Sequence, residues 1–172
     1  MYDAASTAAA SALQQREKYL YTYESKMAFF TRMASSVAGA ELLLESGLMV
    51  RLAEMRVFSA RPEATYQISS AASEATPRSL QVYRQILFPA LRLCLAVLSC
   101  LGSNNVSAVV HVKHFVKANE QVFRSILHPP NRESVGSVSG LEEICLLTGV
   151  LAKTGCSRSG HQSNSLKNIL FC

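Results

Sequence analysis

The sequence predicts an all-α protein made of antiparallel helix pairs, packed either as a bundle or as a piece of an α-solenoid. Apolar residues recur at three- and four-residue steps along most of the 172 residues, which is the spacing of one face of a helix. No stretch alternates between apolar and polar residues as strands do, and short turns join the helical stretches. No repeat of fixed period is visible, which excludes regular tetratricopeptide and ankyrin arrays.

Composition narrows the class of protein. The chain is 49% hydrophobic and 17% charged, so it is too apolar for a disordered protein and has the length of one domain. Its net charge is +5, but the basic residues are scattered singly, and we expect no direct nucleic-acid binding. Five cysteines without tight spacing, and no secretory signal, predict reduced thiols in the cytosol or nucleus.

The first helical stretch covers residues 4–35, as one long helix or two stacked short ones. A short helix is predicted over 40–44, Ser46-Gly47 ends it, and another helix covers 48–57. The apolar face of the first stretch is predicted to comprise Leu13, Tyr19, Leu20, Tyr23, Met27, Phe30 and Met33. Residues 59–77 contain two prolines and few large apolar residues, and predict a mobile surface loop.

The stretch from Ser79 to Leu101 has the strongest helical pattern, and it is apolar on nearly every side. Such a helix must be covered on nearly every side, so we expect it at the centre of the fold. The run Ile86–Leu101 is short for a membrane span, and no transmembrane segment is predicted. Pro89 interrupts the hydrogen-bond ladder of this helix. The proposed structural core is its packed stripe, formed by Tyr83, Leu87, Leu91, Cys94 and Leu98.

The second half of the chain predicts helices over 106–117, 119–128 and about 141–153. Core candidates in the first two are Val109, Val110, Val112, Val116, Val122, Phe123, Ile126 and Leu127, and in the last Ile144, Cys145, Leu147 and Leu151. Ser139 is expected to cap the last helix, while Glu142 and Glu143 suit the positive end of its dipole.

We predict no catalytic, cofactor-binding or metal site. His111 and His114 share a helical face, but no motif supplies the further ligands that a metal needs. Cys94 and Cys145 lie in apolar helical sequence, where burial raises a thiol pKa and disfavours a nucleophile. The remaining candidate is an aromatic cluster whose spacing fits a helix–helix seam better than a base-stacking platform: Tyr19, Tyr21, Tyr23, Phe29 and Phe30.

Five segments, taken in order, resemble one protein family. They are YESKMAFFTRMA at 23–34, LESGLMVRLA at 44–53, RPE at 61–63, YRQILFPALRLC at 83–94 and LLTGVL at 146–151. Together they resemble the C-terminal part of the largest inner-ring scaffold nucleoporins of the nuclear pore complex, the animal two-hundred-and-five-kilodalton nucleoporin family. The resemblance covers roughly residues 15–154.

The resemblance implies an all-α fold in which antiparallel helix pairs stack as a piece of an irregular α-solenoid, with no enzymatic activity and no cofactor. It further implies a structural role in the nuclear pore complex of the nuclear envelope, supporting transport of protein and mRNA. The implied partners are other nucleoporins, especially linker nucleoporins of the inner ring. Residues 1–154 would form the solenoid segment, and residues 155–172 a disordered tail outside the family pattern. The alternative is an independent helical adaptor unrelated to the pore.

Overall fold

A computed structural model describes residues 3–62, 75–128 and 138–155 of the chain. Within these ranges every regular element is helical, which confirms the all-α prediction. The elements are α1 (Asp3–Met33), α2 (Val37–Glu45), α3 (Leu48–Glu54), the 3-10 helix η1 (Arg56–Ser59), α4 (Ala75–Leu101), α5 (Val106–Ala118), α6 (Glu120–Leu127) and α7 (Val138–Lys153).

The first stretch is one long helix, α1, and two sharp turns follow it. Ser36 caps α2 by accepting a hydrogen bond from the backbone N–H of Gly39 at 3.2 Å. A Cβ atom on Gly39 would lie 2.2 Å from the carbonyl oxygen of Met33, so only glycine fits this corner. Gly47, at φ +70°, separates α2 from α3 in the left-handed region that glycine adopts without steric cost. The predicted stop at Ser46-Gly47 is therefore confirmed.

Two boundaries differ from expectation in the region before α4. Residues 56–59 form η1 rather than continuing the preceding helix, and α4 begins at Ala75, four residues before the predicted start at Ser79. Most of the segment expected to be a mobile loop, residues 63–74, lies outside the described residues. Pro89 lies within α4, as the sequence indicates.

Three predictions for the second half are wrong. Helix α7 begins at Val138, so Ser139 lies inside its first turn and does not precede it as a cap. Val110 is 56% exposed because the core side of α5 is occupied by Ala108, Val112 and Phe115. Cys145 is also exposed, because α7 turns Leu147 and Val150 toward the core.

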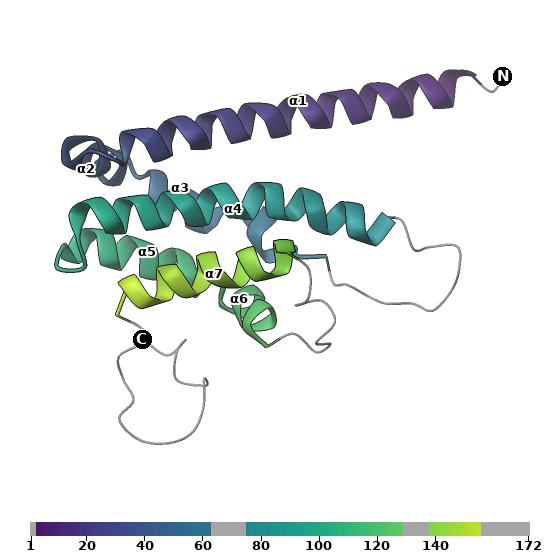
Figure 1. Cartoon of the computed structure of the whole chain (residues 1–172). Helices are drawn as coiled ribbons and strands as arrows, with labels where there is room; N and C mark the ends of the chain where they lie inside the picture. Colours follow the sequence, from purple (N-terminus) through teal and green to yellow (C-terminus); the bar gives the residue numbers. More distant parts are fainter. Residues whose placement is uncertain (1–2, 63–74, 129–137, 156–172) are drawn as a thin grey trace.

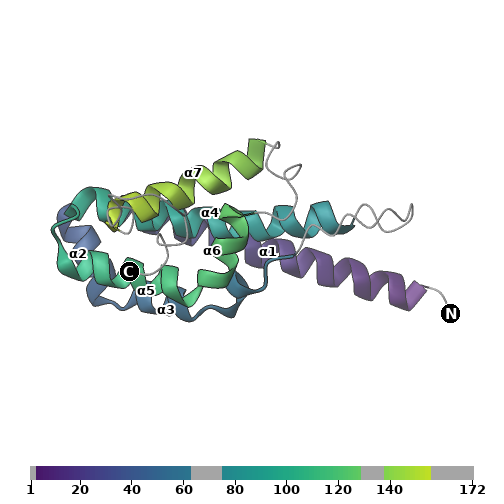
Figure 2. The ribbon, with the colours of Figure 1, turned by 90° about the horizontal axis from the view of Figure 1, so that it is seen from below.

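The helices form two layers (Figures 1 and 2). Helix α4 packs between α1 and α7, and these three helices run in the same direction. Helices α3 and α5 contact each other and run the opposite way in a second layer. Helices that run in the same direction therefore lie side by side within one layer. The N-terminal half of α1 extends away from the other helices.

The core lies between the two layers. Aromatic rings fill the side facing α3, α5 and α6, where Phe115 packs edge-on against Phe58 with ring centres 5.4 Å apart. Phe115 also packs against Phe123, with ring centres 5.8 Å apart. All three rings are fully buried. Aromatic pairs in these tilted arrangements stabilise a core beyond their buried area alone.

Candidate functional site

The proposed core residues of α4 all lie in the interior. Each of Tyr83, Leu87, Leu91, Cys94 and Leu98 is at most 4% exposed. Burial raises the pKa of the Cys94 thiol to about 12. A thiol held protonated in this way is a poor nucleophile at neutral pH. Cys145, the other cysteine considered for chemistry, is exposed on α7, so the burial argument does not apply to it.

A buried ionic centre joins three segments that are far apart in the sequence. Glu143 of α7 accepts hydrogen bonds from Arg61, with Nε 3.3 Å from Oε1 and Nη2 3.2 Å from Oε2. Arg84 of α4 approaches the same Oε2 atom through Nη2 at 3.1 Å and Nε at 3.2 Å. One carboxylate therefore ties together the segment after η1, the first half of α4 and the first half of α7.

Burial makes this centre energetically important. The Glu143 side chain is 2% exposed, and the Arg61 and Arg84 side chains are 19% and 14% exposed. A buried carboxylate is tolerated only when it is paired and hydrogen-bonded, and here both oxygens have cationic donors. The neighbouring Glu142 pairs with Arg92 across the surface of α4 and α7, where both side chains are largely exposed.

Tyr83 extends the polar centre toward η1. Its hydroxyl donates a hydrogen bond to the carbonyl oxygen of Phe58 at 2.8 Å. Burial and the nearby Glu143 carboxylate raise the pKa of Tyr83 far above its ordinary value, while Arg61 acts in the opposite direction. The phenol therefore stays protonated and remains a donor over the whole physiological range.

Sequence reasoning missed this centre because it assigned Glu143 to the helix dipole. A signal was present: Leu147 and Val150 lie four and seven residues after Glu143, which places all three on one face of a helix. A lone carboxylate on an apolar face predicts a buried cationic partner. The partners could not be named from sequence, because Arg61 and Arg84 are 82 and 59 residues away.

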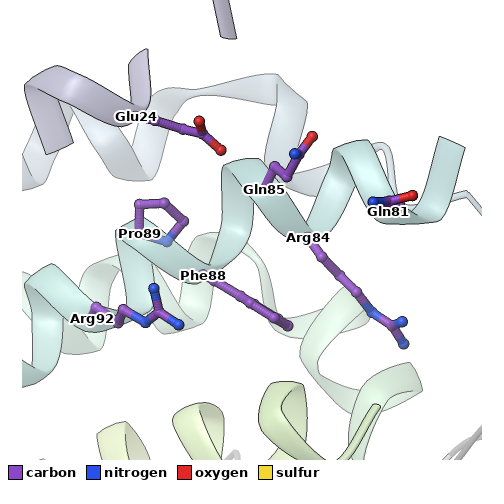
Figure 3. A pocket seen from close by; sticks show the side chains of 7 residues that line it. All are labelled: Glu24, Gln81, Arg84, Gln85, Phe88, Pro89 and Arg92. Carbon is purple, nitrogen blue, oxygen red and sulfur yellow. The ribbon is translucent and has the colours of Figure 1, made fainter. Parts of the chain in front are cut away.

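A recess of about 390 Å³ lies over the outer side of α4, lined by Glu24, Gln81, Arg84, Gln85, Phe88, Pro89 and Arg92. Figure 3 shows Glu24 reaching from α1 toward α4, with Arg84 and Phe88 extending from α4 on the side away from it. Arg84 and Arg92 are neutralised by Glu143 and Glu142. The lining contains no serine, cysteine or histidine, and its one carboxylate is that of Glu24.

The histidines and the aromatic cluster do not assemble a site. In the described part of the chain no three His, Cys, Asp or Glu side chains come together as metal ligands. His111 instead places Nδ1 2.7 Å from the carbonyl oxygen of Ser107. The aromatic cluster is divided: Tyr23 and Phe30 pack on the core, whereas Tyr19, Tyr21 and Phe29 are exposed.

Helix α4 also meets the length and composition of a membrane span over Arg78–Leu101. Apolar core helices of water-soluble folds pass the same test. In this fold α4 is flanked by α1 and α7 and contacts α2 and α5. Arg84, which lies within this segment, pairs with the buried carboxylate of Glu143 in α7. These contacts favour the interpretation of α4 as a core helix.

Comparison with known proteins shows which family the chain is related to. A family model described as nuclear pore complex scaffold, nucleoporins 186/192/205, matches residues 2–154. The chain belongs to this nucleoporin family. It is 40% identical over 139 residues to the human nuclear pore complex protein Nup205, covering 79% of this chain and 7% of that protein. The Drosophila melanogaster Nup205 is 32% identical over a 174-residue alignment, covering 96% of this chain and 8% of that protein.

The nucleoporin match bears on the boundaries of the segment. The chain spans less than a tenth of the length of these curated relatives. The family match includes α1 to α7, so Arg61, Arg84 and Glu143 all lie within it. The match ends at residue 154, one residue before the predicted tail, while the alignment with the fly protein covers 96% of the chain. The division at residue 155 stays a prediction.

Proposed function

We propose that this chain is a structural scaffold segment of the nuclear pore complex inner ring, with no enzymatic activity. Its membership of the scaffold nucleoporin family supports this role. The observation that carries the proposal is the layer in which α1, α4 and α7 lie side by side in the same direction. Stacked antiparallel pairs generate such a layer, and stacking of this kind builds the extended surfaces of an α-solenoid.

The proposed partners are other nucleoporins, especially linker nucleoporins of the inner ring. The proposed location is therefore the nuclear pore complex in the nuclear envelope, where the scaffold would support transport of protein and mRNA. Helical scaffolds bind partner segments on exposed helix faces and in the grooves between helices. The buried Arg61–Glu143–Arg84 centre would contribute indirectly, by holding α7 against α4 and keeping the layer intact.

Affinity purification of the tagged 172-residue chain from cells, followed by mass spectrometry, tests this role. We expect enrichment of inner-ring and linker nucleoporins, and rim staining of the nuclear envelope by the tagged chain. A Leu91→Asp variant is the control, because it should unfold and recover chaperones alone. A reproducible set of partners without nucleoporins would contradict the proposal and favour an independent helical adaptor.

A further inference from the structure

One face of α1 is exposed and carries a regular pattern of cationic and aromatic side chains. It consists of Lys18, Tyr21, Ser25, Phe29 and Arg32, which we call the α1 outer stripe. These residues follow one another at steps of 3, 4, 4 and 3, so they form one line along the helix. All five are exposed. We propose that the α1 outer stripe binds an acidic amphipathic helix of a partner protein, an inference that rests on the scaffold role and specifies its partner.

The aromatic residues of the stripe are suited to anchoring a partner. Tyr21 is 73% exposed and Phe29 is 60% exposed. The ring centres of Phe29 and Phe30 are 5.9 Å apart, and Phe30 packs against the core. Phe29 is therefore held in place by a side chain that is itself packed. Exposed aromatic side chains held in place lose little entropy on binding and are frequent hot spots of protein interfaces.

The charge of the stripe specifies an acidic partner. Lys18 and Arg32 lie at its two ends, and neither takes part in the ion pairs formed within the described ranges. Lys26 borders the stripe on one side and Glu17 on the other, which leaves an excess of two positive charges. Glu24 lies beside α4, at the recess described above. A partner with carboxylates flanking an apolar seam would neutralise this excess.

The geometry favours a helix over a nucleic acid or a membrane. Ridges at three- and four-residue spacing interlock with the grooves of a second helix. Two cations in the stripe are few for a nucleic-acid site, whose affinity comes from neutralising many phosphates. Two large apolar side chains are likewise few for insertion into a bilayer surface, where binding scales with buried apolar area.

The test uses a fluorescent synthetic peptide with leucines at heptad positions a and d and glutamates at e and g, which repel each other and oppose its self-association. Binding to the full chain is measured by fluorescence anisotropy. We expect it to exceed binding of the matched lysine peptide at least tenfold. The Tyr21→Ala/Phe29→Ala variant should bind the glutamate peptide at least tenfold more weakly, and Lys18→Glu/Arg32→Glu should prefer the lysine peptide.

A matched control carries Val106→Ala, Val110→Ala and Lys117→Glu on the exposed side of α5, and should bind like the unmodified chain. Circular dichroism checks that each variant is folded. Equal binding of both peptides, or equal weakening in the control, would overturn the proposal. Tighter binding of single-stranded DNA or anionic vesicles through the same residues would overturn it too. If the stripe variants still recover nucleoporins from cells as the unmodified chain does, the stripe proposal fails while the scaffold role stands.

Discussion

Helices α1 and α4 have similar lengths, 31 and 27 residues, but they are covered to different extents in the fold. Helix α4 is covered by α1 and α7 in its own layer and contacts α5 in the other layer. Its predicted stripe from Tyr83 to Leu98 is buried throughout. Helix α1 is covered only toward its C-terminal end, where Met27 is buried, whereas Leu13 on the same predicted face is 51% exposed.

This difference shows that helical periodicity identifies a face but not its partner. Leu13, Leu20 and Met27 of α1 follow one another at seven-residue steps, so they lie on one face of the helix. Only the later ones meet α4, because the N-terminal half of α1 extends away from the other helices (Figure 2). Burial, and the stability that comes with it, is therefore concentrated around α4.

The largest expected effect on stability comes from placing the same charged residue in each of the two helices. Leu91→Asp should destabilise the fold by about 4 kcal/mol or more, because it buries an unpaired charge in α4. Leu13→Asp in α1 should change stability by less than about 0.5 kcal/mol, since its side chain is half exposed. Chemical unfolding followed by circular dichroism measures both. Similar losses in the two variants would show that the N-terminal half of α1 is packed.

The next effect concerns how α7 is held on α4. Glu143→Gln should cost about 2–4 kcal/mol, because it leaves two partly buried guanidinium groups without their counter-ion. Glu142→Gln is the matched control one residue away, and should cost less than about 1 kcal/mol because its pair with Arg92 is solvent-exposed. The same unfolding experiment compares them, and equal costs would contradict a buried ionic centre.

A pH titration tests whether Tyr23 and Tyr83 are buried as the two helices require. Burial raises the pKa of both phenols above the ordinary value of 10.0. A raised pKa means that the folded state holds the proton more tightly than the unfolded state. The stability that these two phenols contribute should therefore be constant below pH 10 and be lost as the pH rises further. Tyr83→Phe should make this fall shallower. An equally steep fall in the Tyr83→Phe variant would contradict a contribution from this phenol.

The smallest expected effect is at a hydrogen bond between α1 and α4. The Tyr23 hydroxyl donates to the carbonyl oxygen of Ile86 at 2.9 Å. Tyr23→Phe removes this bond while keeping the ring, and should cost about 1 kcal/mol. Tyr19→Phe is the control, because its exposed hydroxyl accepts a hydrogen bond from Gln15 of the same helix. A cost for Tyr23→Phe no larger than that of Tyr19→Phe would mean that this bond does not hold α1 on α4.

Much of the helical framework could be predicted because its signals are local. Gly47 ends a helix through its own backbone freedom, and Asn105 caps α5 by accepting from the N–H of Ala108 three residues away. Failures arose where a side chain's environment comes from another element. Val110 and Phe115 both fit an apolar pattern, but only contact with other helices decided that Phe115 is buried and Val110 exposed.

By itself the sequence determined the helical class, the turn at Ser46-Gly47 and the apolar face of α4, because each depends on residues within a few positions of one another. The resemblance of five ordered segments also sufficed to name the family, which the comparisons confirm. Only the tertiary structure decided that Glu143 meets Arg61 and Arg84, and that Leu13 of α1 stays exposed while Met27 is buried. Both outcomes depend on how whole helices pack, and packing brings together residues whose distance in the chain carries no local signal.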